Sequence, residues 1–468
     1  MTETPLHFKT ITELAGLIHS RQLSPVEVTQ AMLGRIDALD SRLKSFATVM
    51  AEHALSSAKA AEQAIGQGRY LGPLHGVPVA VKDLCFTKNV PTMAGARVLR
   101  EHIPDFDATV IAKLLAAGAI LLGKLNLTEG AMAGYHPEFQ IPVNPWDPQR
   151  WSGASSSGSG VATAAGMCFG SLGSDTGGSI RFPAAACGIV GLKPTWGRVS
   201  RFGVMALAES MDHVGPMTRS VSDAGIVLQA IAGHDANDPT SLLAPVPNML
   251  DGLERGVQGI RIGLDERYVT ENIDAELSEA VLASVRIMGR LGAQIIPLTM
   301  PDTTEYVKAW NVLCAAEAVA AHRNTYPSQR DVYGLWFRAW LDKGAGVTGA
   351  EYAVANNVRA ACNGLLAKVF EDIDILVSPS MNTAPGVVKA EDLYGPMGDG
   401  EDDGHWGRFT IPFDFNGAPT LSLPCGLNGE GLPLSIQFVG KRLAEPMLCQ
   451  VGYAYEQATQ WHNLRPPV

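Results

Sequence analysis

The chain has 468 residues, of which 46% are hydrophobic and 18% are charged, and it carries a formal net charge of −11. This composition predicts a soluble globular protein with a large core, and the negative charge argues against nucleic acid as a partner. The N-terminus has no basic segment followed by an apolar one, and no run of about eighteen apolar residues occurs. We therefore expect a cytoplasmic protein without a membrane as partner.

The seven cysteines are widely spaced and form no Cys-x-x-Cys pair. Disulfides and zinc sites are therefore not expected. The chain also has no His-Glu-x-x-His motif and no carboxylate cluster of the kind that holds a metal. We predict neither a metal nor another cofactor, so the chemistry must come from the protein's own groups.

The N-terminal segment, residues 1–65, is predicted to be helical. A Thr-x-x-Glu cap begins one helix at Thr10, and Ser24 followed by proline begins a second helix that extends to about Leu39. An Ala-rich third helix covers about 51–65. This helix contains a Ser-x-x-Lys tetrad, but the SDN and KTG motifs of penicillin-recognising enzymes are missing, so we interpret the tetrad as chance.

A buried strand is predicted immediately before Lys82. Residues 77–81, Val-Pro-Val-Ala-Val, are apolar throughout, and the end of such a strand would deliver the lysine into an apolar site. A helix over 108–117 and a parallel strand over 120–124 follow. Strands and helices continue to alternate, for example at 261–264 and 274–291, so we predict an α/β protein with a large mixed sheet covered by helices on both faces.

Two segments are candidates for a pocket wall. Residues 129–151 have little regular pattern and precede the Gly/Ser-rich centre of the chain, and residues 306–340 are rich in aromatic side chains, most of which we expect in the core. The segment 418–426 is predicted to close the sheet as a strand. An exposed mobile loop is predicted at 395–407, which contains Asp399, Glu401, Asp402 and Asp403.

Residues 151–195 concentrate glycine and serine: WSGASSSGSGVATAAGMCFGSLGSDTGGSIRFPAAACGIVGLKPT. The apolar run 161–169 suits a buried helix and argues against a flexible linker. The P-loop pattern GxxxxGK[ST] and the nucleophile elbow GxSxG are both absent from it. Two glycines allow the backbone to turn tightly, which predicts an oxyanion hole made by the N–H groups of Thr176, Gly177, Gly178 and Ser179.

A nucleophilic serine needs a base, which is usually histidine. The eleven histidines are scattered singly, and none lies in the Ser-rich segment. Lysine is the remaining candidate, provided that it is neutral. Holding Lys82 neutral near pH 7 means lowering its pKa from about 10.4 by roughly three units, or about 4 kcal/mol, which requires burial.

The motifs of this region resemble those of the amidase signature hydrolases. The sequence GSDTGGSIR stands intact at 173–181, and GLKPT and GRVS follow at 191–195 and 197–200. Upstream, GVPVAVKD at 76–83 resembles the lysine motif of the family. Because so many letters occur in a fixed order, the resemblance is highly specific, and it extends over about 71–231.

The resemblance implies a role for individual residues. Ser179 matches the family's nucleophile, Ser155 the bridging serine that follows a cis peptide, and Lys82 the base. The sequence departs from the family pattern at Ala154 and Ser157, where glycines are usual. Three more residues are expected to support the site, namely Asp175, Arg181 and Ser156.

The resemblance also implies a single α/β domain over residues 1–468. Within it, we expect a signature core at about 71–231, the helical N-terminal segment at 1–65, and insertions that shape the substrate pocket at about 300–410. A homodimer is left open as the assembly.

These inferences predict an amidase that hydrolyses the C–N bond of a small-molecule amide through a Ser179 acyl-enzyme. The aromatic segments hold no cluster of Lys or Arg, which favours a neutral, apolar or aryl amide, or a related carbamate or ester. One alternative is the glutaminase subunit of a tRNA-dependent amidotransferase. Against it, Arg359 stands alone in the 340–370 region, without the paired arginine that would hold a glutamine carboxylate. The other alternative, a non-catalytic scaffold, would not need the lysine and both serines together.

Overall fold

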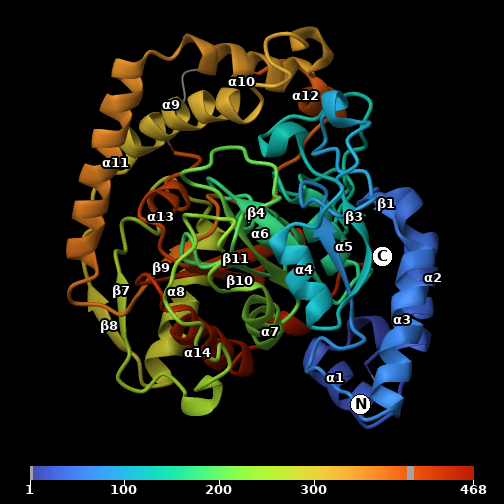
Figure 1. Ribbon diagram of the computed structural model, residues 1–468. Coiled ribbons are helices and arrows are strands. Elements are labelled where there is room, and N and C mark those ends of the chain that lie inside the picture. Colours follow the sequence, from blue (N-terminus) through green and yellow to red (C-terminus); the bar gives the residue numbers. More distant parts are fainter. Residues whose placement is uncertain (1–3, 398–404) are drawn as a thin grey trace.

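The apolar strand before the lysine lies deep inside the sheet. Every residue of β2 (Pro78–Lys82) is buried, and the computed structural model of the chain, which describes residues 4–397 and 405–468, places this strand within an 11-stranded sheet (Figure 1). From edge to edge, the strands are β1 (Phe46–Val49), β3 (Ile120–Leu125), β2, β4 (Gly170–Asp175), β6 (His213–Thr218), β5 (Val190–Lys193), β10 (Thr420–Leu427), β11 (Pro433–Gly440), β9 (Ile375–Pro379), β7 (Arg261–Leu264) and β8 (Gln294–Pro297).

The sheet is mixed. β2 pairs in parallel with β3 and β4, and β7 pairs in parallel with β8 and β9, whereas the remaining pairings are antiparallel. Because β2 and β4 are parallel neighbours, their carboxyl ends lie at the same edge of the sheet. Val81 pairs with Leu172, so Lys82 lies beside the last residues of β4.

Side-chain caps begin several helices. Thr10 and Glu13 form a capping box at the first helix, as predicted, and Ser24 and Glu27 form another at the second. The helices are α1 (Ile11–His19), α2 (Pro25–Leu43), α3 (Ala51–Gly66), α4 (Thr109–Ala116), α5 (Ser157–Ala164), α6 (Arg181–Cys187), α7 (Val221–Ile231), α8 (Ala275–Arg290), α9 (Thr304–Ala321), α10 (Leu335–Gly346), α11 (Gly349–Val369), α12 (Ala390–Tyr394), α13 (Ile411–Phe415) and α14 (Glu445–Gln457).

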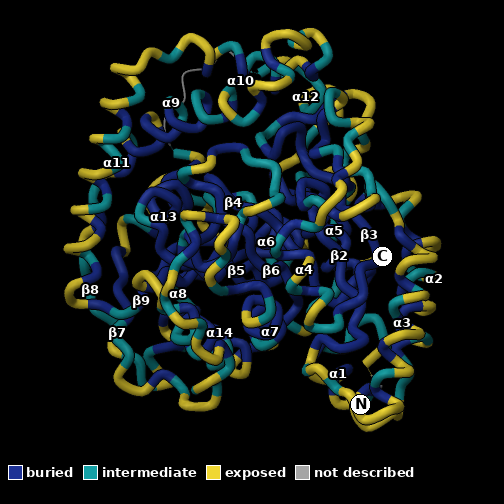
Figure 2. Tube along the Cα trace, in the orientation of Figure 1, coloured by how far each residue is buried: buried dark blue, intermediate teal, exposed yellow. Residues whose placement is uncertain are grey.

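The helices flank the sheet in groups. α5 and α6 contact each other and pack against β4, β5 and β10, whereas α7, α14 and α8 form a second row against β6, β10 and β11. α9, α10 and α11 gather at one margin of the molecule (Figure 1), where α9 and α11 also contact α13. Buried residues fill the sheet and the inner helices, and exposed residues concentrate on the outer faces of helices such as α2, α3 and α11 (Figure 2).

Two of the predicted elements need correction. The segment 1–65 is not helical throughout, because Phe46–Val49 forms the edge strand β1, which pairs antiparallel with β3. Two β-branched residues between two helices supply this strand, and a strand at that place covers the exposed edge of β3. The segment 418–426 does not close the sheet either, since β10 lies in its interior between β5 and β11.

Two further predictions concern the surface of the molecule. Among the helices of the described residues, none is long and apolar enough to cross a membrane. Of the loop predicted at 395–407, residues 398–404 lie outside the described part of the chain, and with them the four acidic residues. Trp406 from the same segment is 39% exposed and belongs to the pocket described below.

Candidate active site

Lys82 lies at the end of β2 with no exposed surface. Its Nζ donates hydrogen bonds to three hydroxyl oxygens, those of Ser155 (2.6 Å), Ser156 (2.9 Å) and Ser174 (2.9 Å). Burial lowers the pKa of the Lys82 ammonium to about 7, against the nearby acidic groups that raise it. A neutral amine donates two hydrogen bonds and accepts one, so three hydroxyls satisfy Lys82 in either protonation state.

The carboxylate next in sequence is engaged elsewhere. Asp83 is buried and pairs with Lys124 at 3.1 Å, and it also accepts a hydrogen bond from the backbone N–H of Met93. Within the described residues, no carboxylate lies at ion-pair distance from Lys82. An unpaired buried lysine favours its neutral form, which is the form that can act as a base.

Backbone contacts join the Ser155 turn to the Ser179 loop. The peptide bond between Ala154 and Ser155 is cis, as the resemblance implies. The N–H of Ser156 donates to the carbonyl oxygen of Ser179 at 3.3 Å. The hydroxyl of Ser156 donates to the carbonyl oxygen of Ser174 and accepts from its N–H. These bonds bring the two serine segments together beside Lys82.

The two residues that depart from the family pattern both have contacts here. Ala154 lines the pocket described below. Ser157 begins α5, and its hydroxyl accepts a hydrogen bond from the buried phenol of Tyr135 at 2.7 Å. The hydroxyl at position 157 therefore ties the irregular segment 129–151 to the Ser-rich turn.

The loop after β4 is shaped by Asp175. Its buried carboxylate accepts hydrogen bonds from the N–H groups of Gly178 (2.7 Å) and Ile180 (2.9 Å). Gly178 has φ +135°, and a Cβ there would lie 2.4 Å from the Phe182 ring, so only glycine fits. The Gly178 N–H is directed to Asp175 and Gly178 does not line the pocket, whereas Thr176, Gly177 and Ser179, the other residues of the predicted oxyanion hole, do line it.

Asp175 and Arg181 form a fully buried ion pair, with Nη2 and Oδ1 2.8 Å apart. Burial alone would raise the pKa of Asp175, but the Arg181 guanidinium outweighs it and holds that pKa below its usual value. Arg181 also pairs with Asp414 at 2.7 Å and donates to the carbonyl oxygen of Thr410. The pair thus fastens the Ser179 loop to the segment around α13.

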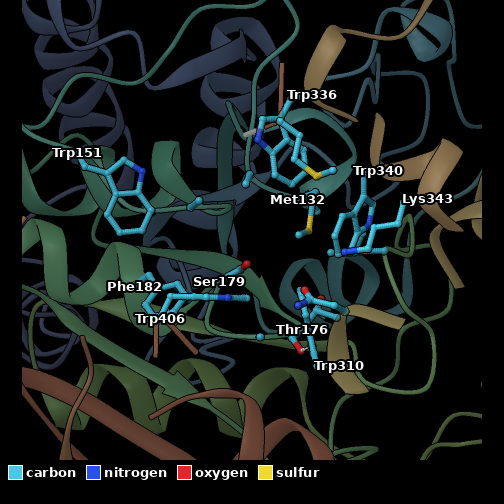
Figure 3. A pocket seen from close by; sticks show the side chains of 17 residues that line it. Met132, Trp151, Thr176, Ser179, Phe182, Trp310, Trp336, Trp340, Lys343 and Trp406 are labelled. Carbon is cyan, nitrogen blue, oxygen red and sulfur yellow. Dashed lines mark hydrogen bonds between the residues drawn. The ribbon is translucent and has the colours of Figure 1, made fainter. Parts of the chain in front are cut away.

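A pocket of about 340 Å³ opens above this loop, and Ser179 lines it. Figure 3 shows Ser179 in the floor, with Trp151 on one side and Trp340 on the other. Five of the eight tryptophans of the chain line the pocket: Trp151, Trp310, Trp336, Trp340 and Trp406. Its other lining side chains are mostly apolar, for example Met132, Phe182 and Leu207.

The aromatic rings contact one another in sequence around the pocket, and we call them the aromatic wall. Its rings, in order of contact, are Trp151, Phe182, Trp406, Trp310, Trp340 and Trp336, with centroid separations between 5.4 and 6.3 Å. The wall contacts the loop after β4 at Trp310, whose Nε1 donates a hydrogen bond to the carbonyl oxygen of Thr176 at 2.8 Å. This hydrogen bond therefore connects the aromatic wall to the loop after β4.

Each of the two predicted pocket segments contributes four residues to the pocket. From 129–151, the structure brings Ala131, Met132, Ala133 and Trp151 to the pocket, and from 306–340 it brings Trp310, Asn311, Trp336 and Trp340. The other aromatic residues of the second segment, such as Tyr333 and Phe337, are buried in the core.

Sequence reasoning missed Ser174 as a partner of Lys82 and Phe182 and Leu207 as pocket residues, and it did not single out Lys343, Met397 and Trp406 within the pocket insertions expected at 300–410. Ser174 could have been found from the parallel pairing of two strands that both end in polar residues. The other residues, Phe182 apart, come from distant segments with no motif.

Within residues 4–397 and 405–468, no group of three or more His, Cys, Asp or Glu side chains could hold a metal ion. The floor of the pocket offers the Ser179 hydroxyl and the backbone amides of the loop after β4, and such groups suit a reaction at a carbonyl carbon.

Comparison with known proteins agrees with this geometry. Residues 27–449 match the protein family described as Amidase. The chain is 46% identical over 458 residues to a Mycobacterium tuberculosis protein assigned provisionally as the amidase AmiD, covering 98% of this chain and 96% of the relative. It is 36% identical over 488 residues to one subunit of the glutamyl-tRNA(Gln) amidotransferase of Chloroflexus aurantiacus, covering 99% of both chains. The fold matches the crystal structure of a bacterial aryl acylamidase of the amidase signature family with a TM-score of 0.88 and 26% identity, over 98% of both chains. The chain therefore belongs to the amidase signature family of amide-hydrolysing enzymes.

Proposed function

We propose that Ser179 is the nucleophile of this amide hydrolase and that Ser155 and Lys82 form its proton relay. The observation that carries the proposal is the buried Lys82, which has a pKa of about 7 and bonds to Ser155 beside a pocket that Ser179 lines. A lysine with that pKa is largely neutral at slightly alkaline pH, where it accepts a proton without a histidine.

The reaction has two halves. In the first, Lys82 takes the hydroxyl proton of Ser155, Ser155 takes that of Ser179, and the Ser179 oxygen attacks the carbonyl carbon. The tetrahedral intermediate collapses as the C–N bond breaks, and the proton on Lys82 returns through Ser155 to the leaving amine. In the second half, water gives up a proton along the same path and attacks the acyl-enzyme, which releases the acid and frees Ser179.

Backbone amides stabilise the developing oxyanion. The N–H groups of Thr176, Gly177 and Ser179 are the candidates, because these residues border the pocket and the Gly178 N–H is bonded to Asp175. Such donors act most strongly when they are fixed in advance, and the Asp175–Arg181 pair holds this loop rigidly. Asp175, Arg181 and Ser156 thus support the site without taking part in bond changes.

The substrate that fits best is an amide with an apolar or aryl group. The aromatic wall offers large apolar surface, and arginine is missing from the pocket-lining residues within the described part of the chain. An aryl carbamate or ester would suit the same surface. We infer a preference for anilides over free amino-acid amides such as glutamine.

An active-site label tests the proposal directly. A fluorophosphonate reacts with an activated serine, and we expect peptide mapping to place the label on Ser179. The enzyme's activity can be measured by absorbance as the release of aniline from an acyl anilide. This activity should fall in proportion to the fraction of enzyme that is labelled. Labelling of another serine, with activity retained, would overturn the assignment of the nucleophile.

A second candidate function is the glutaminase component of a tRNA-dependent amidotransferase, because relatives at 36% identity carry the name of that enzyme. The two candidates differ in substrate. The decisive comparison is kcat/KM for an anilide against L-glutamine under the same conditions. Faster turnover of glutamine, especially with ammonia passed to a partner protein, would favour the amidotransferase.

A further inference from the structure

One charged side chain stands in the aromatic pocket. Among the described residues that line it, Lys343 alone carries a formal charge. It lies on α10 after Trp336 and Trp340, and the spacing of four and three residues puts all three on one helical face. Figure 3 shows Lys343 beside Trp340, on the side of the pocket opposite Trp151.

Lys343 is held there by an aromatic ring and by no carboxylate. Its Nζ lies 5.2 Å from the ring centroid of Trp340, which is a cation–π contact. Within the described part of the chain, no Asp or Glu lies at ion-pair distance from Lys343. Lys343 is exposed and borders an otherwise apolar pocket, and an unpaired cation at that place attracts an anionic group on the ligand.

The nearby acidic residues already have partners. Asp342, next in sequence, pairs with Arg330 and accepts a hydrogen bond from the Tyr326 phenol. Glu317 on the neighbouring α9 accepts hydrogen bonds from Ser210 and Tyr352. Neither carboxylate competes with a ligand for Lys343.

We propose that Lys343 determines specificity by binding a carboxylate at the end of the substrate remote from the scissile amide. The proposal rests on the proposed function, because it treats the pocket above Ser179 as the substrate pocket. It keeps the aryl amide but replaces the neutral substrate expected from the sequence by one with an anionic end. The body of the substrate is aryl and apolar where it meets the aromatic wall, and the end that reaches Lys343 is favoured when anionic and disfavoured when cationic.

A matched substrate series tests this charge preference. Three aryl amides share one scaffold and carry a carboxylate, a methyl or a trimethylammonium group at the para position, first on the acyl half and then on the amine half. The wild-type enzyme should prefer the carboxylate over the trimethylammonium compound in one of the two halves. In Lys343→Met, the ratio of kcat/KM for carboxylate and methyl compounds should fall about tenfold or more, as expected for a charge-assisted contact.

Three variants make the test specific. Lys343→Arg should keep most of the preference, and Lys343→Glu should reverse it toward the trimethylammonium compound. Lys368→Met removes the same charge from an exposed position of α11 outside the pocket, and it should leave all ratios unchanged. The proposal is overturned if the ratio of kcat/KM for the carboxylate and methyl compounds in Lys343→Met stays within about twofold of the wild-type ratio.

A binding measurement separates this proposal from the reaction. In Ser179→Ala, the tryptophans of the pocket report occupancy by fluorescence, so aryl carboxylates and the matched neutral aryl amides can be titrated without turnover. Tighter binding of the carboxylate that disappears in Ser179→Ala/Lys343→Met supports the proposal even if the enzyme hydrolyses no anilide. Equal affinities in both proteins overturn it even if anilides are hydrolysed rapidly.

Discussion

The floor of the pocket and its aromatic wall consist of different chemical groups. The floor consists of backbone amides, hydroxyls and Lys82, all supplied by β2 and the stretch from Ser155 to Arg181, and its side chains are almost completely buried. The aromatic wall comes mainly from segments far apart in the sequence, and Trp406 is 39% exposed. We therefore expect the floor to tolerate few amino-acid substitutions, whereas the rings of the wall can be substituted one at a time.

The two regions also tolerate substitution for different physical reasons. Glycines of the floor are fixed by close approach, as at Gly178, where a Cβ would lie 2.4 Å from the Phe182 ring. Rings of the wall are held by contact area and by edge-to-face or tilted packing, which is worth about 0.5–1.5 kcal/mol per pair. We expect substitutions in the floor to change kcat and substitutions in the wall to change KM.

The largest effect is expected from the floor. Ser179→Ala removes the proposed nucleophile, so kcat for anilides and small aliphatic amides should fall together, by about 10³-fold or more. Binding of an aryl ligand, followed by tryptophan fluorescence, should persist because the wall is untouched. Comparable losses of affinity and turnover would mean that floor and wall do not act separately.

The second effect concerns the proton relay. In the proposed relay, the neutral form of Lys82 is the base, and the fraction that is neutral grows as pH rises through its pKa of about 7. The wild-type profile of kcat/KM should therefore ascend with a midpoint near that value and level off on the alkaline side. Lys82→Met should abolish this limb and lower amide hydrolysis by about 10²–10⁴-fold.

A comparison of leaving groups adds a control for the relay. Ester hydrolysis should suffer less than amide hydrolysis in Lys82→Met, because an alkoxide leaves more easily than an unprotonated amine. If the ascending limb of the pH profile of kcat/KM persists in Lys82→Met, Lys82 is not part of the proton relay.

The difference between floor and wall also explains what the sequence predicted. The GSDTGGSIR motif and the apolar strand before Lys82 are local patterns, and they indicated the loop, the lysine and the serines that the structure brings together. The partner Ser174 follows from the parallel pairing of β2 and β4, whereas Ser156 was expected near Ser155 as a supporting residue. The family and the mixed α/β sheet were predicted correctly for the same reason, since their signals are continuous in the chain.

The wall was predicted only in part because its members meet through tertiary packing. Trp310 and Trp340 stood in a segment expected to be mostly core, and nothing local distinguishes them from Phe337, which is fully buried. Trp406 and Lys343 carry no motif at all. The edge strand β1 was missed because a four-residue strand between two helices has a weak pattern.

The third prediction tests the junction between floor and wall. A Cβ at Gly177 would lie 2.8 Å from Cζ2 of Trp310, whose indole also bonds to the Thr176 carbonyl. Gly177→Ala should therefore displace Trp310 and lower kcat/KM about tenfold or more. Trp310→Phe should reduce the loss of kcat/KM that Gly177→Ala causes. The double mutant should therefore have a higher kcat/KM than the two single effects, added as free energies, predict.

Gly364→Ala serves as the matched control, because a Cβ at this position of α11 meets nothing within 4 Å. It should leave kcat/KM unchanged. Strictly additive effects of Gly177→Ala and Trp310→Phe would show that the two regions are not coupled at this contact.

The smallest effect is expected at the far end of the wall. Trp336 is half-buried, stacks on Trp340 at 5.9 Å and packs over Gly134. Trp336→Ala should raise KM for an aryl amide about tenfold through lost ring contact, with kcat nearly unchanged, and it should leave a short aliphatic amide almost unaffected. Phe202→Ala, which removes an exposed ring outside the pocket, controls for a general loss of aromatic surface. If Trp336→Ala lowers kcat for both substrates alike, the wall contributes to catalysis as well as to binding, and the division between the two regions fails at its most distant point.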